Sequence, residues 1–227
     1  MELVLRGGTL LLYIGILIMT IIGMIALTIV TQKTLKKNTP SYLKFFAPYI
    51  TCSILQTLLS VYCDLNPLPR SIDSISANIF TLLEFLVFCN FFLSIIESKR
   101  FKKFLLFCLF SFPTFCLYYW QKINSFYSFP YILSVIEAFC FLIPCFFYFY
   151  EVFTKPPIQN LSRQSTFWIT TGILFYFITL IPCFLIMKFL EDDWFLFRNL
   201  GLIGFFSTSL FYLLLIKGFL CKNTQIP

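Results

Sequence analysis

Long apolar runs separated by short polar connectors constrain this chain more than any other feature. Of its 227 residues, 59% are hydrophobic and only 12% are charged, and the mean hydropathy is +0.87. A soluble domain carries about a quarter charged residues, whereas an apolar run of roughly 18 residues is typical of a helix that crosses a bilayer. The sequence therefore predicts an all-α fold, a polytopic transmembrane helix bundle.

The runs predict seven spans along the chain. We expect them at about 9–31, 42–63, 77–97, 104–120, 132–153, 166–190 and 200–221. The connectors are short, so we expect a single transmembrane domain over 1–227 and no soluble domain. The first run is too long for a signal-peptide core and is followed, not preceded, by its main positive cluster, so we expect it to be retained.

Positive charge collects on alternate connectors. One set holds Lys33, Lys36, Lys37, Lys99, Arg100, Lys102, Lys103, Lys155, Arg163 and Lys222, and the other holds Arg70, Lys122, Lys188 and Arg198. Because cytoplasmic connectors carry an excess of Lys and Arg, the pattern predicts the N-terminus outside and the C-terminus inside.

The formal net charge of +7 is spread over these short connectors. This distribution predicts contact with anionic lipid heads of the bilayer, and we do not expect a nucleic-acid partner. The densest cluster, Lys99–Lys103, is a candidate contact for a cytoplasmic protein partner.

Composition also limits the chemistry. The chain has no histidine, which excludes His-ligated zinc or haem and nucleophiles activated by histidine. Most of its nine cysteines fall inside apolar runs, where they are interpreted as small hydrophobic side chains, and no Cys-x-x-Cys pair occurs. We expect no metal, no cofactor and no catalytic residues.

Two carboxylates lie inside apolar runs. Glu84 is about seven residues into the third span and Glu137 about five into the fifth, and both spans start on the predicted outer side. A charged residue at the centre of a membrane helix costs about 2.5–3.5 kcal/mol on insertion scales, so it needs a partner, a water-filled cavity or a function. Gln56, from the second span, is expected at the same depth.

Polar residues at helical spacing extend this layer. Asn78, Thr81 and Glu84 share one face, and two further stripes are predicted on the second span (Tyr49, Cys52, Gln56, Ser60 and Cys63) and the fifth (Ser134, Glu137, Pro144, Tyr148 and Glu151). Tyr176 adds a hydroxyl from the sixth span. The predicted ligand-binding residues are therefore Glu84, Glu137, Gln56, Asn78, Thr81 and Tyr176.

Two interpretations of this layer stay open. The polar groups either pin the helices together, or line an outward-open cavity that binds a small molecule or a cation. Two carboxylates brought close share a proton and titrate as a pair.

Three segments carry a resemblance to a known family. They are Asn78 to Phe85, Val135-Ile136-Glu137, and Phe167-Trp168-Ile169-Thr170-Thr171-Gly172-Ile173-Leu174-Phe175-Tyr176-Phe177. In these segments the chain resembles a family of small, uncharacterised seven-helix bacterial integral membrane proteins, over about Ile50 to Cys221. The resemblance implies the seven-span architecture and the bacterial inner membrane. Gln56 departs from the family pattern, which has a glutamate there.

Three classes of function remain. The leading hypothesis is a small-ligand or environmental sensing and signalling module whose outward-facing pocket uses Glu84 and Glu137. The alternative is a proton- or cation-coupled small-molecule transporter, because membrane carboxylates commonly relay ions. The third is a pore-forming or accessory membrane effector that works with a soluble partner, or an intramembrane enzyme.

Overall fold

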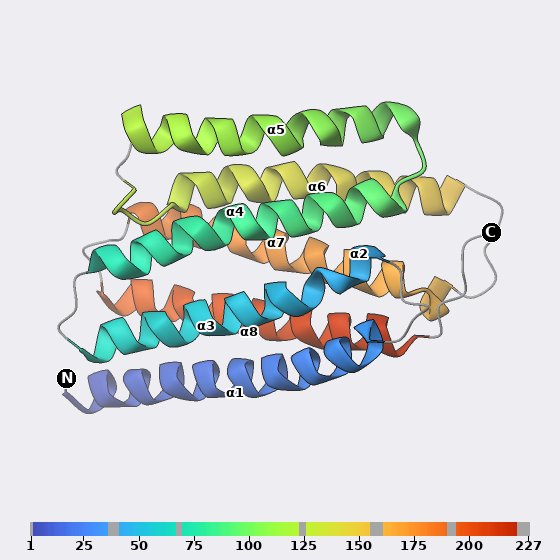
Figure 1. Ribbon diagram of the computed structural model, residues 1–227. Coiled ribbons are helices and arrows are strands. Elements are labelled where there is room, and N and C mark those ends of the chain that lie inside the picture. The colour runs from blue at the N-terminus through green and yellow to red at the C-terminus, as the bar shows by residue number, and fades with distance from the viewer. Residues whose placement is uncertain are drawn as a thin grey trace.

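The computed structural model describes residues 2–35, 41–66, 70–122, 126–154, 161–189 and 194–221, and the side chains of these residues except 2–11, 41–42, 64, 70 and 194–198. The elements are α1 (Glu2–Thr34), the one-turn α2 (Ser41–Lys44), α3 (Phe46–Leu65), α4 (Arg70–Ile95), α5 (Lys99–Lys122), α6 (Tyr131–Thr154), the short 3₁₀ helix η1 (Leu161–Arg163), α7 (Ser165–Phe189) and α8 (Trp194–Leu220) (Figure 1).

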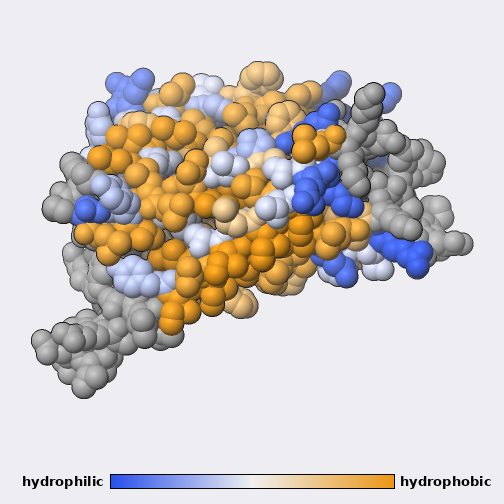
Figure 2. Space-filling view, turned by 60° about the horizontal axis from the view of Figure 1, so that its bottom comes forward, coloured by the Kyte–Doolittle hydropathy of each residue, from blue (hydrophilic) through white to orange (hydrophobic). Residues whose placement is uncertain are grey.

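Seven helices of the described part are long and apolar enough to cross a membrane. Their spans are Leu12–Thr34, Phe46–Cys63, Ser71–Ile95, Lys99–Lys122, Tyr131–Thr154, Ser165–Phe189 and Asn199–Leu220. The predicted all-α bundle with seven spans is confirmed, and the chain is a multi-pass integral membrane protein. Figure 2 shows the corresponding surface, on which a broad apolar band separates hydrophilic residues gathered toward the ends.

Six of the spanning helices form a closed ring. α1 packs against α3 and α8, α3 against α4, α4 against α6, α6 against α7, and α7 against α8. α5 stands outside this ring, at the edge of the bundle in Figure 1, and its main contacts among the described residues are with α4 and α6. From there α5 reaches the α4 and α6 side of the interior, where Phe112 stacks on Phe85 at 4.1 Å and buried Cys116 interacts electrostatically with Glu137.

α4 and α6 run in the same direction in a fixed register. The ring centroids of Phe88 on α4 and Phe141 on α6 are 5.6 Å apart. Ten residues further along each segment, the amide of Ser98 donates a 3.0 Å hydrogen bond to Glu151 Oε1. Glu84 and Glu137 each lie four residues before the paired phenylalanines, so this register brings the two glutamates to one level.

α3 and α4 are antiparallel, and α4 begins earlier than the sequence predicts. The apolar run indicates a start at 77, whereas the helix starts at Arg70. The seven added residues include Asp73 and three serines, so hydropathy does not mark them as helical, although their backbone continues the helix. Consequently Glu84 lies near the middle of the Ser71–Ile95 span.

Aromatic rings fill the centre of the ring of helices. Phe88 contacts the rings of Phe141, Phe177 and Phe211 at centroid distances of 5.6–5.8 Å. Edge-to-face and offset pairs of this kind are favourable beyond their buried area. The phenylalanines thus form a solid layer directly beneath Glu84.

Glycines allow α7 and α8 to approach closely. A Cβ atom at Gly218 would lie 2.9 Å from Ile169 Cγ1 and 3.1 Å from the carbonyl oxygen of Ser165. Gly172 is similar, since its Cβ would lie 3.0 Å from Phe211 Cδ2. Small residues at helix contacts are the usual route to tight packing in membranes, where water does not drive helices together.

Candidate functional site: a buried carboxyl centre

Glu84 is enclosed in the middle of the bundle. Its side chain is 5% exposed, and its Oε1 accepts a 2.7 Å hydrogen bond from the hydroxyl of Tyr49 on α3. Tyr49 is itself 1% exposed, and its ring stacks against Phe80 at 5.7 Å. This short contact between two buried side chains orients the Glu84 carboxyl toward α3.

Glu137 on α6 faces the same region and is less well satisfied. It is 2% exposed, its carboxyl interacts electrostatically with that of Glu84, and among the described residues its Oε1 has no hydrogen-bond partner. A buried polar atom left without a partner is costly, about 1–3 kcal/mol. The centre therefore holds an unused acceptor within the electrostatic range of a second carboxyl group.

Tyrosine hydroxyls extend the centre toward α7 and α8. The hydroxyl of Tyr176 interacts with the Glu84 carboxyl, and its ring lies 5.5 Å from that of Phe211. Tyr212 is fully buried, donates a 2.7 Å hydrogen bond to Ser53 Oγ, and interacts electrostatically with Glu84. Groups from α3, α4, α6, α7 and α8 thus converge on one place.

The arrangement favours chemistry with protons or small cations. Two carboxyl groups in a low-dielectric interior hold two negative charges only at high cost, and a shared proton or a bound cation lowers that cost by removing the repulsion between them. The surrounding hydroxyls can both donate and accept hydrogen bonds. The residues of this "carboxyl centre" are Tyr49, Glu84, Glu137, Tyr176 and Tyr212.

Asn78 belongs to a different contact from the one predicted. It is fully buried, as its stripe predicts, yet its Nδ2 donates to the carbonyl oxygens of Ser74, Phe126 and Ser128 at 2.9–3.0 Å. Its Oδ1 accepts a 2.7 Å hydrogen bond from Trp120 Nε1. Asn78 therefore joins α4 to the end of α5 and to the α5–α6 connector, and its Nδ2 donors are all engaged by backbone carbonyls.

Two other predicted residues are also used differently. Thr81 is buried, but its hydroxyl donates to the Ala77 carbonyl of its own helix at 3.0 Å. Gln56 is half-buried and lies seven residues beyond Tyr49, which is about 10 Å along α3 at 1.5 Å per residue. The expectation that Gln56 shares the level of Glu84 is corrected, because Tyr49 is the α3 residue at that level.

The predicted polar stripes of α4 and α6 are buried, whereas the buried polar face of α3 is rotated away from its predicted stripe. Ser134, Glu137, Pro144 and Tyr148 are buried as expected, with Glu151 half-buried at the end. On α3 the predicted Tyr49 is buried, but Ser53 and Thr57 share its buried face, whereas Cys52, Gln56 and Ser60 are half-buried. Sequence reasoning did not select Tyr212; a tyrosine in the middle of an apolar run, away from both interfaces, is the signal that points to it.

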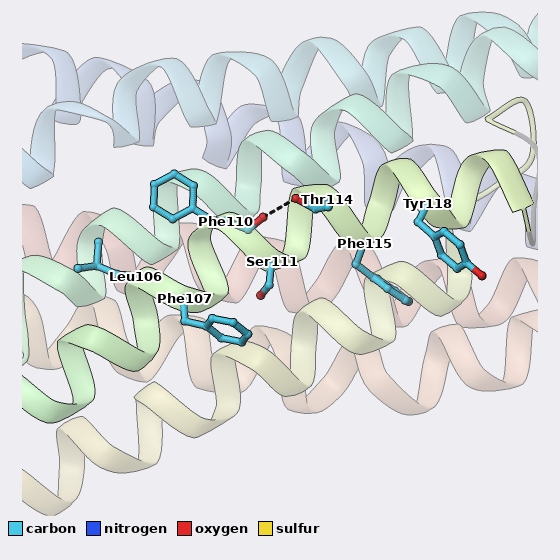
Figure 3. Close-up of a pocket in the computed structure, with 7 residues that line it drawn as sticks. All are labelled: Leu106, Phe107, Phe110, Ser111, Thr114, Phe115 and Tyr118. Carbon is cyan, nitrogen blue, oxygen red and sulfur yellow. Dashed lines mark hydrogen bonds between the residues drawn. The ribbon is translucent and has the colours of Figure 1, made fainter.

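A groove lies on α5, away from the carboxyl centre. Its volume is about 760 Å³, and Figure 3 shows its lining side chains, all of which come from this one helix: Leu106, Phe107, Phe110, Ser111, Thr114, Phe115 and Tyr118. The hydroxyl of Thr114 donates to the Phe110 carbonyl of the same helix at 2.9 Å. The groove is open and mostly apolar, and it follows the outer side of a helix that the ring leaves exposed.

The described residues contain no group of three or more Cys, Asp or Glu side chains that could hold a metal ion. The nine cysteines are all in the free thiol form, and four of them, Cys89, Cys116, Cys145 and Cys183, are buried. They pack as small apolar side chains.

Comparison with known proteins finds no matching family model, no similar curated protein and no similar solved structure.

Proposed function

We propose that this membrane protein is a sensing and signalling module whose carboxyl centre binds a proton, a small cation or a small cationic ligand. One observation carries the proposal: two buried carboxyl groups interact, and one of them keeps an acceptor oxygen without a hydrogen-bond partner among the described residues. A bound cation or proton interacts with that oxygen and lowers the negative charge of the pair by one.

The geometry supports a response of the whole bundle to binding. Because the centre takes groups from five helices, a change in the charge of Glu84 or Glu137 alters contacts on each of them. A ligand shifts a conformational equilibrium only through its different affinity for the two states. A neutralised and a charged carboxyl pair differ strongly in the contacts they favour, so the centre is suited to such a shift.

The test uses the purified protein in detergent, with Tm measured across pH and across a panel of alkali cations and small amines. At least one condition should raise the Tm of the wild type, and Glu84→Gln and Glu137→Gln should each abolish that rise. Glu97→Gln, which changes an exposed acid after the end of α4, is the matched control. If both core variants retain the rise, the carboxyl centre is not the binding site.

The same variants separate binding from packing. If the glutamates only hold the helices together, Glu84→Gln and Glu137→Gln change the Tm by the same amount under every condition. The Tm of the wild type then does not depend on the conditions in the panel. In that case the sensing proposal fails.

Coupled transport is the second candidate, because Glu84 and Glu137 are buried inside membrane-spanning helices, and carboxyl groups in such positions commonly relay ions. Wild-type proteoliposomes with an imposed pH gradient should then show proton or cation flux, and Glu137→Gln liposomes should not. Binding without flux favours the sensor.

We further propose that the N-terminus lies outside, that the membrane is the bacterial inner membrane, and that the chain belongs to the uncharacterised seven-helix family. The basic residues support the orientation: Lys33, Lys99, Arg163 and Lys217 follow or precede helix ends on one side of the bundle, whereas Lys122 and Lys188 lie at the other. A cytoplasmic protein that receives the signal would meet the first of these sides.

A further inference from the structure

The first turn of α5 carries an unusual concentration of positive charge. Lys99, Arg100, Lys102 and Lys103 lie within five residues, and the turn contains no acidic residue. A helix N-terminus carries a partial positive charge, so acids are normally favoured there and cations are disfavoured. The helix therefore begins with a charge that has no counter-charge in its own first turn.

Several backbone amides at this helix start are already hydrogen-bonded. Glu151 on α6 accepts hydrogen bonds from the amides of Glu97 and Ser98 at 3.1 and 3.0 Å, and Ser98 Oγ accepts from the amide of Phe101 at 3.4 Å. The negative charge of Glu151 is thus directed at backbone amides. Its two hydrogen bonds here are to the main chain and not to the four cationic side chains.

The same contacts hold the cations in a fixed place. The ring of Phe101 stacks on that of Phe147 at 4.0 Å with an interplanar angle of 8°, next to the Glu151 contact. Lys99, Arg100 and Lys103 are exposed and Lys102 is half-buried. The first turns of α5 therefore present a basic surface, defined by Lys99, Arg100, Lys102 and Lys103, on a backbone that is anchored to α6.

This basic surface lies where the apolar part of α5 begins. The Lys99–Lys122 helix is long and apolar enough to span a membrane, and the exposed rings of Phe104 and Phe107 follow the cations directly. Residues at that boundary lie at the depth of lipid head groups, and clusters of Lys and Arg beside a spanning helix attract anionic lipids. Lipid phosphate is the anion present there at the highest concentration.

We infer that the basic surface is a binding site for the phosphate group of anionic membrane lipids. Lys99, Arg100 and Lys103 supply the exposed charges, and Glu151 acts as a positioning residue by fixing the chain that presents them. The site is separate from the carboxyl centre and does not depend on the proposed function.

The test reconstitutes the full chain in nanodiscs of neutral phosphatidylcholine and of phosphatidylcholine with increasing phosphatidylglycerol. Wild-type Tm should rise with the anionic fraction, and high salt should reduce the rise because exposed charges are screened. The quadruple variant K99Q/R100Q/K102Q/K103Q should lose the rise. The double variant R100Q/K103Q should lose part of the rise in Tm. Because it changes only exposed side chains, it shows the loss in a protein that still folds.

The control variant K122Q/K188Q removes cations from the opposite end of the bundle and should keep the full rise. The inference is overturned if the quadruple and double variants respond to phosphatidylglycerol like the wild type, or if the control loses the response equally. It is also overturned if inorganic phosphate stabilises the wild type in neutral nanodiscs, which would indicate a soluble anion, or if only an added soluble protein binds this surface.

Discussion

The hydroxyl of Tyr49 donates a 2.7 Å hydrogen bond to Glu84 Oε1 in the interior of the bundle. The two residues lie on neighbouring antiparallel helices, and neither side chain is more than 5% exposed. This contact orients one member of the carboxyl pair, while Glu137 on α6 keeps an oxygen with no partner among the described residues. The two glutamates are therefore unequal, although the register of α4 and α6 puts them at one level.

Removing the Tyr49 hydroxyl tests this contact. Tyr49→Phe keeps the ring packing but leaves a buried carboxyl oxygen without its donor, so we expect a loss of about 1–3 kcal/mol in the free energy of unfolding. Tyr62→Phe, on the exposed face of the same helix, should change stability by far less. Equal effects of the two variants, measured by denaturant titration in micelles, would contradict the role of the contact.

Asn78 should be much more sensitive than another asparagine of α4. Asn78→Ala removes hydrogen bonds to Ser74, Phe126, Ser128 and Trp120, and we expect about 2–4 kcal/mol of destabilisation from these lost bonds. Asn90→Ala is the control, because its Nδ2 donates only to the Leu86 carbonyl of its own helix among the described residues. Its cost should stay below about 1 kcal/mol.

Trp120 reports on the same junction. Its indole fluorescence should shift to longer wavelength in Asn78→Ala, since the Nε1 donor then bonds to water. An unchanged emission spectrum would show that the indole does not depend on Asn78. Asn90→Ala should leave the spectrum as in the wild type.

Glu151 should control the mobility of the segment that precedes α5. Glu151→Ala removes the acceptor of two amides, so hydrogen exchange at Glu97 and Ser98 should become faster. Glu151→Gln retains a carbonyl oxygen and should give an intermediate rate. If neither variant changes exchange at these amides, the contact is not what orders the segment.

Close contact between α7 and α8 predicts opposite effects for two glycines of α8. Gly218→Ala introduces a Cβ 2.9 Å from Ile169 Cγ1, and overpacking of this kind typically costs about 1–3 kcal/mol. At Gly204 the nearest atom to an added Cβ is Leu180 Cδ2 at 3.8 Å, so Gly204→Ala should be neutral or stabilise the helix by up to about 1 kcal/mol. Unfolding in micelles measures both variants.

Thiol labelling tests the orientation. With the N-terminus outside, a membrane-impermeant maleimide should modify Cys221 in inside-out vesicles and not in right-side-out vesicles, and Cys221→Ser should remove that product. Burial raises the pKa of the Cys221 thiol above its usual range, although Lys217 opposes the effect. The thiolate is the reactive form, so the labelling rate should be low near neutral pH and keep rising above pH 8.5, the approximate usual value.

The sequence predicts the bundle well because the bilayer imposes strong demands. Each span needs a long apolar run, and a buried acid is costly enough that Glu84 and Glu137 stand out as interior residues. The structure agrees on both points. The common level of the two glutamates comes from the register of α4 and α6, because Glu84 lies 14 residues after the start of α4 at Arg70 and Glu137 only six after the start of α6 at Tyr131.

The partners of the glutamates are harder to predict. Membrane helices are apolar on both faces, so a stripe of polar residues on α3 gives only a weak indication of which face is inside. Tyr49 replaces Gln56 because α4 starts at Arg70, which shifts the register of α3 against α4. The acceptors of Asn78 include backbone carbonyls of a connector, which no side-chain pattern can reveal.

The shared direction of α4 and α6 has a consequence for the biogenesis of the protein. Two helices that cross in the same sense cannot be joined by a simple turn, so α5 has to be threaded across the bilayer before Glu137 can meet Glu84. Tyr176 and Tyr212 emerge from the ribosome later still. Tyr49 is synthesised 35 residues ahead of Glu84. It is therefore the one member of the carboxyl centre that can hydrogen-bond to Glu84 when this residue first enters the membrane.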